Sequence, residues 1–408
     1  MNGIVKACAV TALIAQTAQQ TQAQDTTLTA VGSTPKPEPW EKLLNPGPFR
    51  IRPYAWLDGY YDSNILLTER DKEDDFIWAI NPGVTIATAN YADAQGSYVV
   101  LDYLANVFVF TQGTEDTGWG QNVNLAGRWV GAKVVLDLSQ GYYGTFGGLL
   151  GVTNRLDREF AGRLVDQQVI PTAGQLVYQL GDKTSIEADA LQLIRLLEED
   201  LNSYNEWRLA TWFNYRLTEK VQTAVGGAVG WRDLENNPNQ RYEQALARVR
   251  YQVATKVNAM ASVGLEWDQW QGGYDQGPFA VFMVGATYQP WENTFINLQG
   301  YRRQYPSVTL RTQNYLTGGF QLSINQKIWQ RLSASLSAGY DRTTYEPSAS
   351  GVRADRTDDY FFVSPAVGYS FTPHWDAGLF FNYRKNSSDR AGLDYEGYQV
   401  GFRTGFRF

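Results

Sequence analysis

The stretch that decides the fold is WDAGLFFNYR, residues 375–384. One side of this stretch is apolar and consists of Trp375, Ala377, Leu379, Phe381 and Tyr383. The other side carries Asp376, Gly378, Asn382 and Arg384, together with Phe380. A repeat of two residues is the pattern of a β-strand that has one apolar and one polar face. The preceding segment, residues 360–371, also alternates, so a hairpin with a tight turn at 372–374 is predicted.

The same alternation continues along the chain from Phe49, most clearly at residues 257–268 and 332–341. Aromatic residues stand near the ends of these segments, which is typical of the girdles at a membrane interface. Small polar residues on the opposite side suit a water-filled lumen better than the core of a soluble sandwich. The sequence therefore predicts an all-β protein: a transmembrane antiparallel up-and-down β-barrel of the Gram-negative outer membrane.

About eight tight turns alternate with nine longer connections, which predicts about 18 strands, with 16 as the alternative. An even number of strands places both ends of the chain on the periplasmic side. The stretch Leu191–Leu201 fits a helical stripe as well as a strand that runs into a loop. The longest connection, residues 147–170, either folds inward and narrows the pore or forms a surface loop.

The N-terminal region predicts export. Residues 1–23 are expected to be a signal peptide, because their apolar run is too short for the roughly 20 residues of a spanning helix. Residues 24–48 are rich in Thr, Pro and Gln and are expected to form an extended periplasmic arm, and residues 49–408 the barrel. The only cysteine, Cys8, lies in the signal peptide, so the mature chain has no thiol chemistry.

Composition and motifs exclude several classes of function. A net charge of −7 without a clustered basic face argues against nucleic-acid binding. The only histidine, His374, falls in a predicted periplasmic turn, away from any nucleophile that it would have to activate. We therefore expect no enzyme activity, no cofactor and no resident metal. Acidic pairs such as Asp74-Asp75, Glu198-Glu199-Asp200 and Asp358-Asp359 fall in predicted loops, where they are solvated or form a calcium or lipopolysaccharide-bridging site.

The polar faces of the predicted strands supply the candidate site, because a pore selects by the size and charge of its lining. The candidate lumen-lining residues are Arg128, Arg208, Arg216, Arg248, Arg250, Glu266, Arg303, Arg384, Arg403 and Arg407. Acidic residues such as Asp137, Glu187 and Asp376 share these faces, so neither sign of charge dominates. A mixed lining suits a hydrated, hydroxyl-rich solute, although the same charges would also pair purely for stability.

The segment Tyr60-Tyr61-Asp62-Ser63-Asn64-Ile65, followed by Asp74-Asp75-Phe76-Ile77 and Asn81-Pro82-Gly83-Val84, resembles the β-barrel porin 2 family. The resemblance implies an eighteen-strand-type barrel that exports exopolysaccharide or carries related surface glycans. Physically, Asp62 and Asn64 are expected to form side-chain turns, and Pro82-Gly83 to bend the second strand or form a bulge.

Three functions follow as alternatives. The first is a passive conduit for export of a surface polysaccharide, with periplasmic polysaccharide-export proteins as partners. The second is a general diffusion porin for small hydrophilic solutes. The third is a non-conducting surface adhesin or structural barrel. In each case the expected partners are outer-membrane lipid, lipopolysaccharide and the barrel-insertion machinery, which would read the last strand, Tyr398 to Phe408.

Overall fold

A computed structural model of the protein describes residues 44–88, 91, 96–113, 117–146, 159, 162, 164–198, 201–235, 237–254, 256–310, 313–345 and 356–408. The predicted signal peptide and most of the predicted periplasmic arm lie outside these residues. Within them no helix is long and apolar enough to cross a membrane.

The described chain forms eighteen β-strands of 13 to 15 residues each. They are β1 (Phe49–Asp62), β2 (Asp75–Thr88), β3 (Tyr98–Phe110), β4 (Gly118–Val130), β5 (Val134–Phe146), β6 (Gln167–Gln179), β7 (Thr184–Leu197), β8 (Tyr204–Arg216), β9 (Val221–Leu234), β10 (Gln240–Ala254), β11 (Val257–Trp270), β12 (Tyr274–Tyr288), β13 (Thr294–Pro306), β14 (Asn314–Lys327), β15 (Leu332–Tyr345), β16 (Arg356–Ser370), β17 (Trp375–Ser388) and β18 (Tyr395–Arg407).

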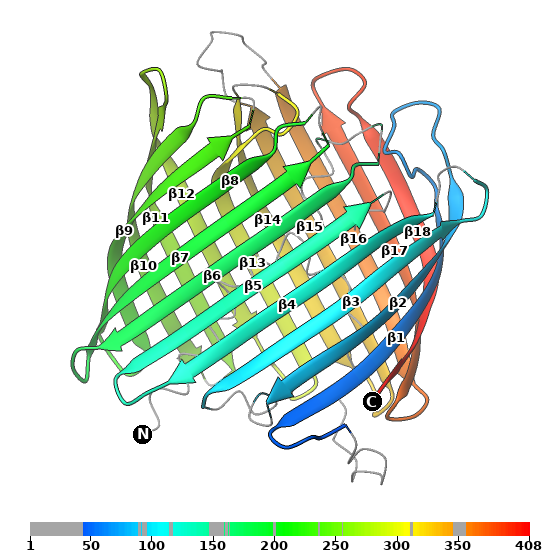
Figure 1. The fold of residues 1–408 in the computed structure, drawn as a ribbon, viewed down its shortest axis with the longest axis horizontal. Coiled ribbons are helices and arrows are strands. Elements are labelled where there is room, and N and C mark those ends of the chain that lie inside the picture. The colour runs from blue at the N-terminus through cyan, green and yellow to red at the C-terminus, as the bar shows by residue number, and fades with distance from the viewer. Residues whose placement is uncertain are drawn as a thin grey trace.

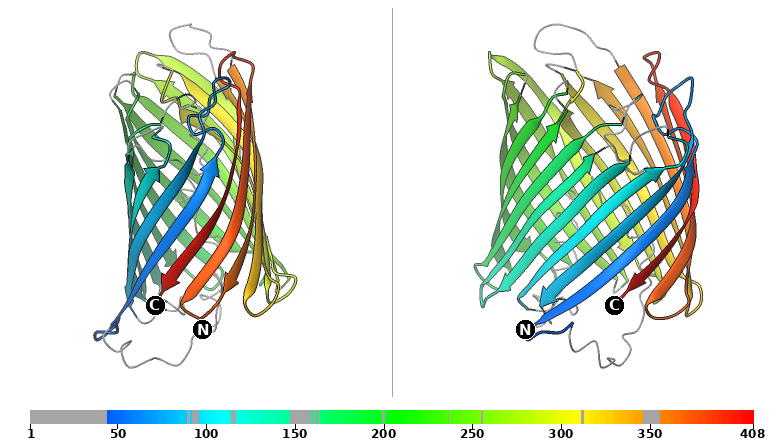
Figure 2. Two further views of the ribbon diagram at one scale, coloured as in Figure 1. Left: turned by 90° about the vertical axis from the view of Figure 1, so that its right-hand side faces the viewer. Right: turned by 45° about the vertical axis from the view of Figure 1, so that its right-hand side comes forward.

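Each strand pairs antiparallel with its neighbours in sequence, and β18 pairs with β1 to close the sheet (Figures 1 and 2). The closing register runs from Tyr54 opposite Arg407 to Asp62 opposite Gln399. The predicted all-β barrel is confirmed, with eighteen strands rather than sixteen. Residues 191–197 belong to β7, so the helical alternative for that stretch is wrong.

The two ends of the barrel differ. Short turns, such as residues 180–183 and 371–374, lie at the end where the chain finishes (Figure 2). The long connections lie at the opposite end, and the longest joins β5 to β6 through residues 147–166. Barrels of this kind have short periplasmic turns and longer external loops. We therefore call the two ends the periplasmic end and the outer mouth.

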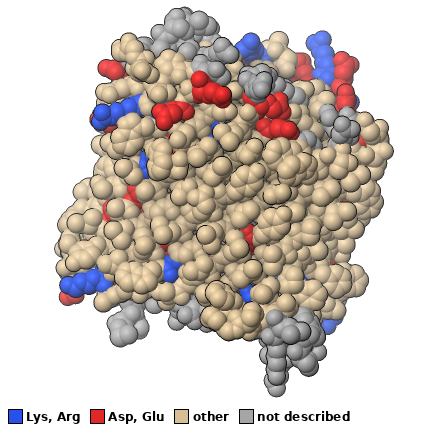
Figure 3. Space-filling model, in the orientation of Figure 1, with Lys and Arg blue, Asp and Glu red and all other residues tan. Residues whose placement is uncertain are grey.

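The outer wall of the barrel is apolar. Large side chains such as Trp129, Val225, Leu379 and Phe406 are exposed there, while the opposite faces of their strands carry polar groups. On the face shown in Figure 3, most charged side chains gather near the two ends, and a mostly uncharged band lies between them. In a closed sheet the backbone N–H and C=O groups form hydrogen bonds with neighbouring strands, and the apolar band suits a lipid environment.

Two local expectations need correction. Asp358 and Asp359 lie in β16, so this pair does not stand in a loop as expected. Asp75 begins β2, whereas Asp74 lies in the connection before it and Glu198 in the connection after β7. Glu199 and Asp200 lie outside the described residues. Pro82 keeps its register opposite Ala55 in β1, and β2 runs through Pro82-Gly83 without a register shift. The proline removes a donor, and the pairing of β2 with β3 is interrupted only between Ile80 and Gly83. The stretch is therefore a gap in one ladder rather than a bulge.

Candidate functional site: the lumen and its outer mouth

All ten predicted lumen-lining residues lie on the inner face of the wall. On β8, for example, Glu206, Arg208 and Trp212 alternate with the exposed outward residues Trp207 and Leu209. Every second side chain of a strand points to the inner face, so one inward polar residue shows which residues of that strand point inward. The structure adds what alternation does not give: which of these groups lie together, and at what height in the barrel.

One charged cluster lies on β7, β8 and β10. Both guanidinium Nη atoms of Arg248 donate to Glu187, at 2.9 and 2.7 Å. Arg250 lies 3.6 Å from the same carboxylate, and Asn214 donates to it at 3.2 Å. The Arg248 guanidinium also stacks 4.2 Å from the centre of the Trp212 ring. A bidentate, buried pair of this kind has most of its hydrogen-bonding capacity used within the wall.

A second charged cluster lies closer to the outer mouth and is centred on Glu206 of β8. Tyr242 donates to this carboxylate at 2.6 Å, and Arg303, from β13, donates to it at 2.6 Å. Arg232 lies 3.7 Å from Glu206 and equally far from Glu266 and Asp268 of β11. The groups of this cluster come from five strands, β8, β9, β10, β11 and β13.

The wall around β1 carries a different arrangement, a row of neutral amides. Arg403 of β18 donates to Asp58 of β1 at 2.5 and 2.8 Å. Asn81 of β2 donates to Asp58 at 3.0 Å, and Asn106 of β3 donates to Asn81 at 2.7 Å. The row ends at β4, where Asn122 donates to Asn106 at 3.1 Å. We call Asn81, Asn106 and Asn122 the amide row; together with Asp58 and Arg403 it follows the inner circumference across five neighbouring strands.

The other predicted arginines are also held by partners on the wall. Arg128 lies 3.7 Å from Asp137, and Arg384 donates to Asp62 at 3.0 Å. Arg208 donates to Gln244 at 3.1 Å, and Glu266 accepts a short hydrogen bond from the same glutamine. Arg407 lies 3.0 Å from Asp376. Arg216, the last residue of β8, is exposed at the periplasmic end.

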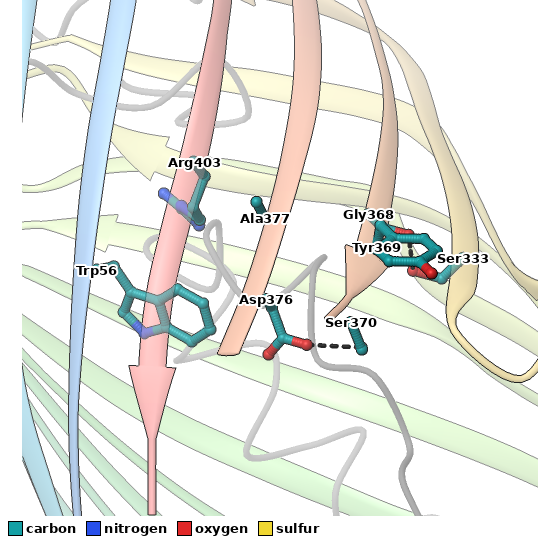
Figure 4. A pocket seen from close by; sticks show the side chains of 8 residues that line it. All are labelled: Trp56, Ser333, Gly368, Tyr369, Ser370, Asp376, Ala377 and Arg403. Carbon is teal, nitrogen blue, oxygen red and sulfur yellow. Dashed lines mark hydrogen bonds between the residues drawn. The ribbon is translucent and has the colours of Figure 1, made fainter. Parts of the chain in front are cut away.

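Near the periplasmic end, Arg403 and Asp376 line a small recess with Trp56, Ser333, Gly368, Tyr369, Ser370 and Ala377 (Figure 4). Ser370 donates to Asp376 at 2.6 Å across it. The Trp56 ring covers Gly405 so closely that a side chain at that glycine would overlap it. The recess is too confined to be a substrate site and is part of the packing of the wall.

Described residues of the β5–β6 connection reach across the outer mouth. Glu159 from this connection accepts hydrogen bonds from the Ser307 hydroxyl at 2.5 Å and from the Val308 amide at 3.2 Å. Thr309 and Tyr345 donate to the same carboxylate at 3.3 and 3.4 Å. These partners lie on β15 and on the β13–β14 connection, about halfway around the barrel from β5. We call this set of contacts the Glu159 latch. Burial raises the pKa of the Glu159 carboxyl above its ordinary value.

Apolar contacts hold the same connection in place. Val165 is buried in a cluster that also contains Leu201, Tyr204, Leu234, Trp270 and Val308. Its neighbour Leu164 packs against a second cluster, which includes Ile65 from the β1–β2 connection. The Gly162 amide donates to the Leu66 carbonyl at 2.7 Å. The predicted inward fold of the connection is therefore present at its described residues, and the surface-loop alternative does not hold for them.

Several of these residues could not be identified as part of a site from the sequence alone. Asn81, Asn106 and Asn122 share the inner parity of their strands, but their alignment into one row depends on the strand register. Glu159 lies in a connection without periodicity, so nothing in the sequence distinguishes it from the neighbouring charges. The expected side-chain turn is confirmed, since Asp62 accepts from the Asn64 amide at 3.0 Å. The same Asp62 also receives Arg384, a role that the sequence did not suggest.

The described residues contain no group of three or more His, Cys, Asp or Glu side chains that is arranged to hold a metal ion. His374 lies in the β16–β17 turn, where its Nδ1 is 3.0 Å from the Arg407 carbonyl oxygen. Its position at the periplasmic end agrees with the position that the turn pattern predicts.

The closed eighteen-stranded sheet, the apolar outer band and the polar interior define an outer-membrane β-barrel. No family model and no curated protein matches the chain. Among solved structures it is similar to the outer membrane protein OpdK of Pseudomonas aeruginosa, at 14% identity over 88% of this chain and 99% of that chain, with a TM-score of 0.43.

It is also similar to OpdO of Pseudomonas aeruginosa, at 12% identity over 88% of this chain and 97% of that chain, with a TM-score of 0.45. OccAB3 of Acinetobacter baumannii is similar at 9% identity over 88% of this chain and 99% of that chain, with a TM-score of 0.43. Similarity at this level adds nothing about function, and the class of the protein rests on its own geometry.

Proposed function

We propose that the protein is a diffusion channel for small hydrophilic solutes across the outer membrane. The observation that carries this proposal is the outer mouth, where Glu159 and Val165 of one connection reach residues on the opposite wall. Barrels of 16 to 18 strands leave an aqueous channel. A connection that crosses the mouth reduces the size of solute that such a channel admits, so small molecules fit the geometry better than a polymer.

The chemistry of the wall suggests which small solutes pass. The arginines at Glu187, Glu206 and Asp58 face carboxylates at short range, so their fields largely cancel within the wall. The amide row, on β2, β3 and β4, adds neutral donors and acceptors to the lumen. Amides and paired charges both hydrogen-bond hydroxyl groups without favouring one sign of charge. We therefore expect neutral, hydroxylated solutes to pass, with weak selectivity between cations and anions.

The test is reconstitution of the purified protein into planar bilayers and liposomes. We expect single-channel conductance, a ratio of cation to anion permeability within about threefold of unity, and swelling of liposomes by monosaccharides. Liposomes prepared in parallel without protein are the control. An absence of conductance would refute the proposal and favour a non-conducting adhesin or structural barrel.

Export of a surface polysaccharide is the second candidate, because the resemblance of residues 60–84 to the β-barrel porin 2 family points to it. A single glycan chain would pass through an eighteen-stranded barrel only after the β5–β6 connection has left its contacts at the outer mouth. Deletion of the gene discriminates the two functions. Loss of surface polymer with unchanged uptake of small solutes would support export, and slower uptake with unchanged polymer would support diffusion.

A further inference from the structure

Among the described strands, the shortest ladder in the wall is the one between β12 and β13. These two strands pair over only seven residues each, from Phe282 opposite Arg302 to Tyr288 opposite Ile296. Toward the outer mouth the pairing stops, although β12 continues to pair with β11 as far as Tyr274. On the other side, β13 continues to pair with β14 up to Pro306. Residues 274–281 of β12 and 303–306 of β13 therefore share no ladder, and we call this region the β12–β13 seam.

The ends of β13 and β14 near the outer mouth separate from β12 because they turn toward the lumen. Asn314 of β14 exchanges hydrogen bonds with Gln240 of β10, at 3.0 and 3.1 Å, and donates to Asp268 of β11 at 3.4 Å. Arg232 of β9 donates to the Gln304 carbonyl at 3.4 Å. These partners lie on the inner face of strands beyond β12. Across the seam itself, the Gln304 side chain donates to Gln276 at 3.4 Å.

The seam reaches into the depth of the outer leaflet. Trp267 of β11 is exposed on the outer wall and marks the aromatic girdle at the outer interface. The last pair of the ladder includes Phe282, which stands opposite Val263, four residues further down β11. With a rise of about 3.3 Å per residue and a tilt of about 40°, the seam extends roughly 10 Å below the girdle.

Apolar side chains stand on both sides of the wall where the seam begins. On the inner face, Val281 lies at the end of the ladder and is buried, and Leu246 lies across Gly264, which pairs with Val281. Met260 and Met283 continue this inner patch on the same two strands. On the outer face, Phe282 and Leu265 are exposed. The seam thus joins an apolar patch in the lumen to the lipid-facing wall.

Unpaired strand edges are costly in hydrocarbon, and they are tolerated only where they line a wet cavity or face other polar groups. We propose that the β12–β13 seam is a lateral passage between the lumen and the outer leaflet, used by amphipathic molecules with an apolar part of modest size. The apolar part would pass beside the edge of β12, from Val281 on the inner face to Phe282 on the outer face. The polar part would stay with the glutamines of the seam and the charged cluster above them. This function is additional to axial diffusion of hydrophilic solutes.

The edge of β12 is less suited to binding an added strand from a partner protein. Pro278 stands in this unpaired segment and has no backbone N–H to donate. The strand also carries an irregular register against β11 between Glu266 and Asp268. Proline and bulges are the features that protect natural sheet edges from pairing with another strand. A passage for small molecules therefore fits the seam better than strand addition.

The test links β12 and β13 covalently across the seam and measures the passage of two kinds of solute, an amphipathic probe and ions. The double variant Ala280→Cys with Gln304→Cys places thiols on the two unpaired edges, and a bis-maleimide of matching length bridges them. The double variant Ala286→Cys with Leu298→Cys is the matched control, because these two residues are directly opposite in the intact ladder. Cys8, in the predicted signal peptide, is the only native cysteine, so the bridges are unambiguous.

The amphipathic probe is N-phenylnaphthylamine, whose fluorescence reports entry through the outer membrane of intact cells. We expect entry to be at least fivefold faster in cells that carry the protein than in cells that lack it. Bridging the seam should return entry to the background rate, while bridging the control pair leaves it unchanged. Equal entry with and without the protein would overturn the proposal, and so would an equal loss in both bridged variants. Ion conductance, measured before and after bridging, tests axial diffusion separately.

Discussion

Removing the Glu159 carboxylate should open the outer mouth. In Glu159→Ala the hydroxyl of Ser307 and the amide of Val308 lose an acceptor at 2.5 and 3.2 Å, and two weaker contacts disappear with them. A hydrogen bond contributes about 0.5–1.5 kcal/mol, and more where its acceptor is charged, although ionisation of the buried carboxyl group carries a desolvation cost. A net loss of about 2–3 kcal/mol shifts the balance between held and released connection by roughly 30- to 150-fold.

The assay is single-channel recording of the reconstituted variant, together with liposome swelling by sugars of increasing size. We expect a higher mean conductance and a larger size limit than in the wild type, because the connection spends more time away from the opposite wall. The apolar contacts of Val165 remain, so the barrel itself should fold and resist denaturant as before. If conductance and size limit are unchanged in a folded Glu159→Ala barrel, the latch does not control the mouth.

Three further predictions concern pH, the charged wall and a glycine. The pKa of Glu159 is raised in the latch, so the protonated carboxyl stabilises the held connection. This stabilisation is fully present below the ordinary pKa of about 4.3 and is lost as the pH rises through the raised value. Conductance should therefore increase from acidic to neutral pH. Arg248→Met leaves Glu187 buried without its bidentate partner and should cost about 3–5 kcal/mol in a urea unfolding titration. Gly230→Ala forces a Cβ into the Tyr242 ring and should cost about 1–3 kcal/mol in the same titration.

Each of these predictions has a matched control. Glu159→Gln keeps the latch uncharged at every pH, so a pH dependence of conductance that survives in this variant would show that groups other than Glu159 cause it. Replacing Glu187 and Arg248 together by methionine should recover most of the loss. Gly127→Ala meets nothing closer than 3.7 Å and should be nearly neutral; a cost equal to that at Gly230 would show that the Tyr242 ring is not the cause.

The architecture could be predicted because period-two alternation is local. A few residues are enough to predict both a strand and the direction of its two faces. In β17, for example, Trp375 points outward and Arg384 points inward. The strand count followed from the turns between these segments. The same local signal placed all ten candidate residues on the inner face, since parity alone decides that question.

The arrangement of the site could not be predicted because it depends on register and on connections. Glu187 and Arg248 are 61 positions apart, and only the stagger of β7, β8, β9 and β10 brings them to one height. The amide row needs Asn81, Asn106 and Asn122 to be level on three strands. Acidic pairs were placed in loops because charge runs usually are solvated, whereas Asp75 and Asp358 are buried at the outer ends of their strands.

The central claim, that the barrel admits small hydrophilic solutes past a narrowed mouth, is tested most directly by the size limit of the wild-type protein. The measurement is the rate of swelling of proteoliposomes in sugars that grow from a monosaccharide to a long oligosaccharide. We predict rapid swelling with monosaccharides and a steep fall in the swelling rate with increasing chain length. Equal rates for a monosaccharide and a long oligosaccharide, or no entry of either, would contradict it.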